Sequence, residues 1–302
     1  MRVLIVGTGA VGGYFGAKLA RFGHDVVFTA RGENLEALRR RGLTIEQTDG
    51  NLHVDGIRAV ESPQGEGPFG LVLVCVKVQH TETALAGLSA EIQSHALVLS
   101  LQNGVESEEA IERLLGLPEL LRGTAYVGVE LVSPGVIHHT SGGTIVVGEI
   151  DGRRSERLES LERLLRDAAI DVIVPPDIRR AKWQKLAWNA SFNLVSALSG
   201  APIGGILDSP EARRVIETVM AEVEAVAAAE SVPFEVEYIP RVLKLAERLH
   251  RAVRPSTLQD RDKRKPLEHD ALTGAVVRFG ERHGIATPMS RTLDRLARLV
   301  SG

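Results

Sequence analysis

The chain has 302 residues, of which 44% are hydrophobic and 25% charged, and its formal net charge is −3. This length and composition predict a globular protein of about two domains, and the charge favours neither nucleic acid nor an anionic membrane as a partner. The single cysteine, Cys75, excludes an internal disulfide and a cysteine-rich metal site, so we predict no bound metal.

The chain begins without the features of a signal peptide. No basic region, long apolar stretch or cleavage site precedes the first apolar run. No apolar run reaches the length of a membrane span. Together with the single cysteine, these features predict a protein of the reducing cytoplasm that works away from membranes.

A glycine-rich motif near the N-terminus predicts a dinucleotide site. The apolar run from Val3 to Val6 is typical of a buried parallel strand. Three glycines follow in the spacing G-x-G-x-x-G, before a helical pattern, and they allow the backbone to approach a pyrophosphate closely. The helix N-terminus would add free N–H groups. A glycine-rich turn without a ligand is the alternative. We expect the cofactor to contact Gly7, Thr8, Gly9, Ala10, Val11 and Gly12.

The end of the second expected strand, Val26 to Thr29, predicts which cofactor is used. An acidic residue there would hold the ribose 2′-hydroxyl of NAD. This chain has Arg31 instead, which can bind a 2′-phosphate through charge-assisted hydrogen bonds, so we predict NADPH. Glu33 follows at a helix start, where a carboxylate is favoured in any case. A solvated surface charge is the alternative interpretation of Arg31.

Two further strands are expected to end beside the cofactor, because the carboxyl ends of parallel strands meet at one edge of the sheet. The run from Phe69 to Val76 ends at Lys77, which we expect to contact a phosphate, the ribose or the substrate; a surface lysine is the alternative. The run from Ala96 leads to Asn103, whose carboxamide we expect to bind the nicotinamide side or the substrate; a turn asparagine is the alternative.

The rest of the first half predicts more strands. Loose alternation over Leu43 to Ala59 predicts a hairpin or two short strands. His138 and His139 are adjacent in an expected strand and face opposite sides, which argues against a metal pair. The later elements are three strands, a helix and a last strand, expected over Gly123–Val132, Val136–Thr140, Thr144–Gly148, Ser155–Ala168 and Asp171–Val174.

Pro175-Pro176 marks a change, because helical periodicity replaces strand patterns after it. We therefore predict an α/β fold, with an N-terminal Rossmann-type doubly wound sheet over residues 1–174 and an all-α C-terminal domain over residues 175–302. The mixed charges between Val253 and Pro266 predict a solvated loop. Later helices are expected over Ser209–Ser231, Phe234–Ala252, from Pro266, and over Met289–Val300.

A polar stripe lies on an otherwise apolar helix that is expected from Asp177 to Gly200. The members of the stripe share one face by their spacing, and they are Lys185, Asn189, Asn193 and Ser196. Polar groups on a buried helix need partners, so the stripe predicts a ligand site. A solvated stripe or a hydrogen-bond network between helices is the alternative. Beside a nicotinamide ring, Lys185 could act as general acid, because hydride transfer to a ketone leaves an alkoxide that needs a proton. Partial burial would lower its pKa toward neutrality.

The segment DIRRAKWQKLAWNASFN around this stripe resembles the signature of ketopantoate reductases (2-dehydropantoate 2-reductases). The similarity extends to GTGAVGG with Arg31, to VCVKVQ, SLQNG and STLQD, and so covers nearly the whole chain. The resemblance implies an NADPH-binding Rossmann domain followed by a helical domain that supplies the proton donor.

The resemblance also implies roles for single residues. Lys185 would be the general acid, and Glu268 would contact the substrate and support the lysine. Without the resemblance Glu268 does not stand out, because we expect it in the first turn of a helix, where any carboxylate is favoured. Asn103 and Lys77 would flank the crevice between cofactor and substrate. The substrate-binding residues would be Asn103, Asn189, Asn193 and Ser256. A turn or a helix cap is the alternative for Ser256.

We therefore predict that the chain reduces 2-dehydropantoate to pantoate with NADPH, a step toward pantothenate and coenzyme A. Ile203 departs from the family pattern, in which an asparagine can occur there, and this leaves open a reductase of another branched 2-keto acid. A non-catalytic NADPH-binding sensor is the alternative from a different class. The alanine-rich helices are compatible with a homodimer interface or with contacts inside the chain.

Overall fold

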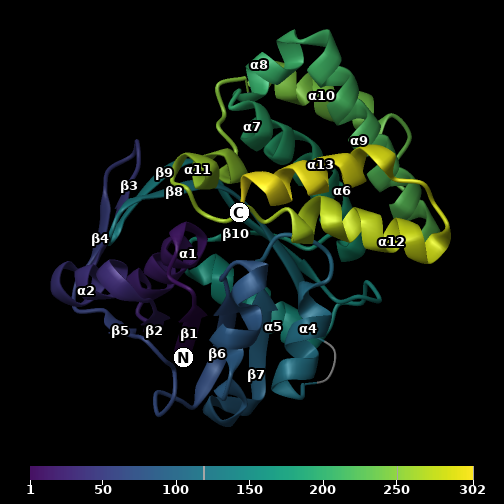
Figure 1. Ribbon diagram of the computed structural model, residues 1–302. Coiled ribbons are helices and arrows are strands. Elements are labelled where there is room, and N and C mark those ends of the chain that lie inside the picture. The colour runs from purple at the N-terminus through teal and green to yellow at the C-terminus, as the bar shows by residue number, and fades with distance from the viewer. Residues whose placement is uncertain (118–119, 250, 302) are drawn as a thin grey trace. The chain divides into compact units, whose positions relative to one another are not determined.

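The computed structural model describes residues 1–117, 120–249 and 251–301, and its contacts divide the chain into two compact units (Figure 1). The sheet unit consists of Met1–Gln102 and Ser107–Ile178, and the helical unit consists of Asn103–Glu106 and Arg179–Gly302. A short segment from the first half of the chain therefore belongs with the helices, and it begins at Asn103, one of the predicted site residues.

A five-stranded parallel sheet forms the centre of the sheet unit, in the order β5-β2-β1-β6-β7 (Figure 1). Alternation along β1 sends Val3 and Ile5 into one apolar cluster, and Leu4 and Val6 into another. Burial on both faces explains why this strand is a continuous apolar run. The strands are β1 (Arg2–Val6), β2 (Asp25–Thr29), β5 (Arg58–Val60), β6 (Phe69–Val74) and β7 (Ile92–Ser100).

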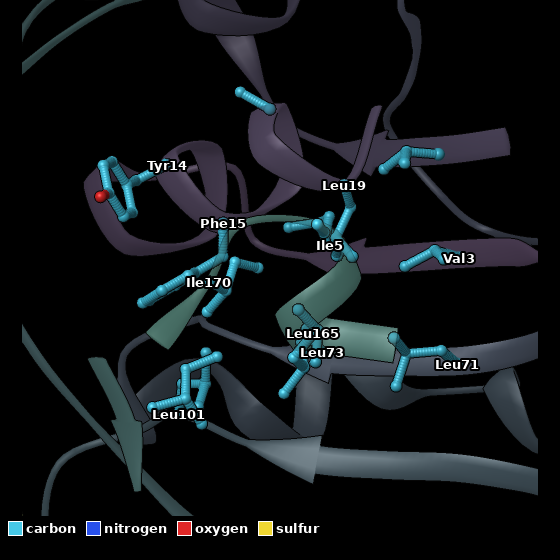
Figure 2. Packing of buried hydrophobic residues seen from close by; sticks show 14 of the residues in the cluster. Val3, Ile5, Tyr14, Phe15, Leu19, Leu71, Leu73, Leu101, Leu165 and Ile170 are labelled. Carbon is cyan, nitrogen blue, oxygen red and sulfur yellow. The ribbon is translucent and has the colours of Figure 1, made fainter. Parts of the chain in front are cut away.

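Helices cover both faces of this sheet. Phe15 and Leu19 belong to the first cluster together with Val3 and Ile5, and Figure 2 shows these residues among its members. The second cluster includes Ile111, from a helix on the opposite face. A parallel sheet covered in this way confirms the predicted α/β class. The helices and 3-10 turns of the unit are α1 (Ala10–Arg21), α2 (Gly32–Arg41), η1 (Val78–His80), α3 (Thr81–Leu85), η2 (Leu88–Glu91), α4 (Ser107–Leu115) and α5 (Glu156–Asp167).

A second, mixed sheet has the order β10-β9-β3-β4, with β8 also paired to β9. Over residues 43–60 the chain forms three strands, since β3 and β4 make a hairpin here while β5 joins the parallel sheet. One strand, β9, replaces the two expected over Val136–Thr140 and Thr144–Gly148. The positive φ angles of Gly142 and Gly143 let it continue through a register shift. The strands are β3 (Leu43–Glu46), β4 (Leu52–Val54), β8 (Arg122–Ser133), β9 (Val136–Gly148) and β10 (Asp171–Ile173).

The described part of the helical unit contains helices and their connections. Its apolar core includes Phe192, Val219, Met220 and Val223, which are 0% exposed. None of the described helices is long and apolar enough to cross a membrane. The elements from the start of the long helix onward are α6 (Ile178–Trp188), η3 (Asn189–Asn193), α7 (Leu194–Ser199), α8 (Ile203–Asp208), α9 (Pro210–Ala229), α10 (Tyr238–Leu249), α11 (Ser256–Asp262), η4 (Asp270–Gly274), α12 (Ala275–His283) and α13 (Pro288–Val300).

Two expectations in this unit are wrong. The charged stretch expected as a loop contains helix α11, whose Thr257 and Leu258 are buried in the unit while Asp260 and Arg261 are half-buried and Asp262 is exposed. Glu268 is not in the first turn of a helix, because η4 begins only at Asp270.

Candidate active site

The glycine loop after β1 is built by backbone constraints. Gly7 has φ +97°, and its N–H donates to Oγ1 of Thr29 at 2.8 Å. A Cβ on Gly7 would lie 2.5 Å from Cγ1 of Val76, and one on Gly12 would lie 2.2 Å from the carbonyl oxygen of Gly7. Both positions therefore require glycine for the turn itself, whether or not a ligand binds.

The outer side of the same loop fits a dinucleotide. A Cβ built on Gly9 meets no heavy atom within 4 Å, and no side chain caps the helix that Gly9 precedes. The hydroxyl of Thr8 is buried and has no hydrogen-bond partner among the described residues. Ala10 and Val11 are half-buried. An open cradle with a free hydroxyl and uncapped N–H groups suits a pyrophosphate.

The two predicted cationic contacts also belong to the sheet unit. Arg31 is exposed and directly precedes α2. Lys77 is half-buried and follows β6, immediately before η1. Near it, the buried amide of Gln102 donates to the carbonyl of Val76 at 2.9 Å and to the hydroxyl of Thr81 at 2.7 Å, which fixes the chain after the strand. Gln102 was not singled out in the sequence.

Four predicted residues of the helical unit form one hydrogen-bonded chain, which we call the amide chain. The Asn193 amide donates to Oδ1 of Asn189 at 3.1 Å, and the Asn189 amide donates to Oδ1 of Asn103 at 3.2 Å. The Asn103 amide then donates to Oε2 of Glu268 at 3.1 Å. Asn189, Asn193 and Glu268 are at most 6% exposed, so these bonds satisfy groups that would be costly to bury alone.

A π-helical segment places the two helix asparagines. The long helix does not stay regular, because Asn189 to Asn193 form the π-turn η3 between α6 and α7. The hydroxyl of Ser191 donates to the carbonyls of Ala187 and Trp188, at 2.6 and 3.2 Å, and so satisfies acceptors at the wider turn. Such insertions often occur at functional sites.

Lys185 lies one turn before the amide chain, and its side chain is half-buried. Burial lowers the pKa of its ammonium to about 8, with the nearby charge of Lys182 acting in the same direction and Glu268 opposing it. A lysine in this state gives up a proton more easily than an ordinary lysine and is still largely charged at neutral pH. It can therefore supply both a proton and a positive charge.

Three residues from the sequence interpretation lie outside the amide chain. The hydroxyl of Ser196 donates to the carbonyl of Ala201 and so stabilises the turn that follows α7. Ser256 is exposed at the first residue of α11 and, within the described residues, is not hydrogen-bonded to the amide chain. Ile203 is fully buried in the helical core. The departure at Ile203 therefore concerns packing in this structure.

Several contributors were missed in the sequence. Lys182 is 5% exposed and precedes Lys185 by one turn, a spacing that could have indicated it. Gly104 has φ +91°, and a Cβ on it would lie 2.7 Å from the carbonyl oxygen of Ala271. Nδ1 of His269 lies 2.7 Å from Oδ1 of Asp294 and anchors the segment next to Glu268. No local pattern could have paired His269 with Asp294.

The chemistry available in the helical unit is proton donation and recognition of a polar ligand. Lys185 supplies a cation, Glu268 an acceptor, and the asparagines supply amide donors and acceptors. Among the described residues, no group of three or more histidine, cysteine, aspartate or glutamate side chains could hold a metal ion.

Comparisons with known proteins agree over almost the full length. Residues 3–152 match the family described as Ketopantoate reductase PanE/ApbA, and residues 177–301 match Ketopantoate reductase PanE/ApbA C terminal. The 2-dehydropantoate 2-reductase of Mesorhizobium japonicum is 32% identical over 321 residues, which cover 99% of this chain and 97% of the relative.

Solved structures show the same similarity. The crystal structure of 2-dehydropantoate 2-reductase from Geobacter metallireducens GS-15 matches with a TM-score of 0.93 at 32% identity and covers 99% of each chain. A ternary structure of D-mandelate dehydrogenase with NADH and anilino(oxo)acetate also has a TM-score of 0.93, covering 100% of this chain and 98% of that one. Its identity is only 21%, so this likeness concerns the fold alone.

Proposed function

This chain belongs to the ketopantoate reductase family of oxidoreductases, and we propose that it reduces 2-dehydropantoate to pantoate with NADPH. The observation that carries the proposal is Lys185, an ammonium whose pKa is lowered to about 8 and which interacts with Glu268 at the end of the amide chain. A protein that only senses a nucleotide has no need for such a proton donor.

The sheet unit would hold the cofactor. The loop residues Gly7, Thr8, Gly9, Ala10, Val11 and Gly12 would surround the pyrophosphate, because their outer side is open at Gly9 and the Thr8 hydroxyl has no hydrogen-bond partner in the described part of the chain. Arg31 would bind the 2′-phosphate that distinguishes NADPH from NADH, and Lys77 would contact the cofactor or the substrate. When bound, NADPH supplies the hydride.

The helical unit would supply the proton. Lys185 holds a proton on Nζ that passes to the carbonyl oxygen of the keto acid as that oxygen becomes an alkoxide. Glu268 keeps the lysine charged, because its carboxylate opposes the effect of burial on the lysine pKa. It would also accept a hydrogen bond from a substrate hydroxyl.

The amides would recognise the polar groups of the substrate. Asn103, Asn189 and Asn193 are held in one arrangement by their mutual hydrogen bonds, so binding does not have to order them. Ser256 would meet the substrate carboxylate from the start of α11. A cytoplasmic location, a homodimer and a place on the route to pantothenate and coenzyme A stay predictions.

A steady-state assay tests the proposal. The wild-type chain is given NADPH or NADH with 2-dehydropantoate and with a panel of branched 2-keto acids. We expect kcat/KM to be highest for 2-dehydropantoate with NADPH. A higher kcat/KM for another 2-keto acid would show that 2-dehydropantoate is not the preferred substrate. A preference for NADH would show that NADPH is not the preferred cofactor. NADPH binding without turnover of any acid would favour a sensor.

A further inference from the structure

Arg278 of α12 joins two segments that carry residues of the amide chain. Its guanidinium donates to both carboxylate oxygens of Glu106, at 2.5 and 3.4 Å. The same guanidinium donates to Oδ1 of Asp270 at 2.8 Å and to the carbonyl oxygen of Asp270 at 3.1 Å. Glu106 follows Asn103 by three residues, and Asp270 follows Glu268 by two. One side chain therefore fastens the segment of Asn103 to the segment of Glu268.

The other residues of the segment Asn103–Glu106 also contact the helical unit. Asn103 is part of the amide chain, Gly104 lies against the carbonyl of Ala271, and Val105 packs on the helical core. All four residues are irregular and half-buried, without strand or helix hydrogen bonds to fix them. Glu106 is thus the charged end of a short segment that side-chain contacts must hold.

The ion pairs of Arg278 are too exposed to contribute much to stability. The side chains of Arg278, Glu106 and Asp270 are 41%, 31% and 67% exposed, and exposed ion pairs contribute little. The guanidinium is, however, planar and makes several directed hydrogen bonds at once, so it fixes the relative position of its partners. Loss of Arg278 should therefore change the relative position of its partners more than the free energy of unfolding.

We propose that Arg278 is a positioning residue that holds Asn103 against Glu268. The inference rests on the proposed function, since it assumes that these two residues serve the reaction. Without Arg278, the segment of Asn103 loses its charged anchor, and the hydrogen bonds of Asn103 to Glu268 and to Asn189 loosen. Small misplacements of this kind can cost large factors in rate.

The first test is kinetic. Arg278→Met should lower kcat/KM for the keto acid about tenfold and leave NADPH affinity unchanged, and Glu106→Gln should reproduce most of this loss. Arg278→Lys should lose less activity than Arg278→Met, because lysine keeps the positive charge but not the planar set of guanidinium N–H donors. The control is Arg291→Met, which removes a similarly exposed ion pair with Glu281 at 2.8 Å and should have no effect.

A double-mutant cycle separates positioning from general damage. If Arg278 acts through Asn103, Arg278→Met should cause no further loss of kcat/KM in an Asn103→Ala background. Losses that multiply, or an Arg278→Met enzyme that behaves like Arg291→Met, would overturn the proposal.

A second measurement does not depend on turnover. Urea unfolding gives the coupling between Asn103→Ala and Glu268→Ala, each of which removes the hydrogen bond between the two side chains, and Arg278→Met should reduce that coupling to less than half. A coupling that is unchanged without Arg278 would refute the positioning role. An inactive wild-type enzyme would refute the proposed function, while the unfolding cycle would still decide the role of Arg278.

Discussion

The glycine loop and the amide chain are two opposite ways of building a polar site. In the loop, backbone groups form the site, and glycines are required because a Cβ at Gly7 or Gly12 would overlap neighbouring atoms. In the amide chain, side chains form the site, and Asn103, Asn189 and Glu268 come from segments that are far apart in the sequence. A backbone site depends on local geometry, whereas a side-chain site depends on the packing of the whole unit.

This difference predicts how each site fails. Substitutions in the loop should act on cofactor binding or on folding. Substitutions in the helical unit should act on turnover and leave cofactor binding intact. The following variants test that separation, in order of decreasing effect.

Lys185→Met should have the largest effect, because it removes the proton donor. We expect kcat to fall by about a thousandfold, within the range for loss of general acid catalysis, while NADPH affinity in a fluorescence titration stays unchanged. Lys244→Met, at an exposed lysine of α10, is the matched control and should keep full activity. Unchanged turnover in Lys185→Met would show that the acid is another group.

Gly9→Ala and Gly12→Ala separate two functions inside the loop. A Cβ on Gly9 meets no heavy atom of the described residues within 4 Å, so Gly9→Ala should fold normally but raise the Kd for NADPH about a hundredfold, which corresponds to ~2.8 kcal/mol. A Cβ on Gly12 would lie 2.2 Å from the carbonyl oxygen of Gly7, so Gly12→Ala should cost about 1–3 kcal/mol of unfolding free energy. Calorimetric titration and urea unfolding measure these effects. Normal NADPH affinity in Gly9→Ala would place the phosphates elsewhere.

Arg31→Ala should have a smaller and selective effect. Loss of a charge-assisted hydrogen bond on an exposed side chain should weaken NADPH binding about tenfold. Binding of NADH, which lacks the 2′-phosphate, should not change, and this comparison is the internal control. Equal losses of affinity for NADPH and NADH would mean that Arg31 does not bind the 2′-phosphate.

The pH dependence should be the subtlest measure. The protonated lysine is the acid, and burial sets its pKa at about 8, so kcat/KM for reduction should fall as the pH rises through about 8. Glu268→Gln should move the midpoint to lower pH, because it removes the charge that raises this pKa. Lys182→Met should move it to higher pH, because it removes a like charge. A midpoint that neither variant shifts would assign the titration to another group.

The glycine loop and the amide chain also differ in how well the sequence predicts them. The glycine loop, the strand before it and the α/β class could be predicted, since a tight turn and a buried strand leave local patterns. The spacing of Asn189 and Asn193 gave a shared helix face, but nothing local connects them to Asn103 or Glu268. The resemblance to a family named those residues, and the folded chain was needed to show their hydrogen bonds.

The errors also have a physical cause. Helix α11 was expected as a loop because a run of mixed charges is typical of a solvated segment, and only two of its residues, Thr257 and Leu258, are buried. Glu268 was assigned to a helix start from the proline before it, but it lies before η4, where its carboxylate accepts a hydrogen bond from Asn103. Arg278 could not be predicted as a connector, because its partners, Glu106 and Asp270, meet only when two distant segments are packed together.

The π-helical segment η3 gives this helix one residue more than its direction requires. A π-turn holds one residue more than an α-turn, so deleting one residue between Asn189 and Asn193 would restore a regular helix. Such a deletion would leave α6 and α7 facing nearly the same way, because a turn of either kind rotates the chain by about one full circle. The spacing of Asn189 and Asn193 would, however, shrink from four residues to three, and the amide of Asn193 would leave its present place in the amide chain. In this part of the gene, one codon is therefore dispensable for the direction of the helix and needed for the geometry of the site.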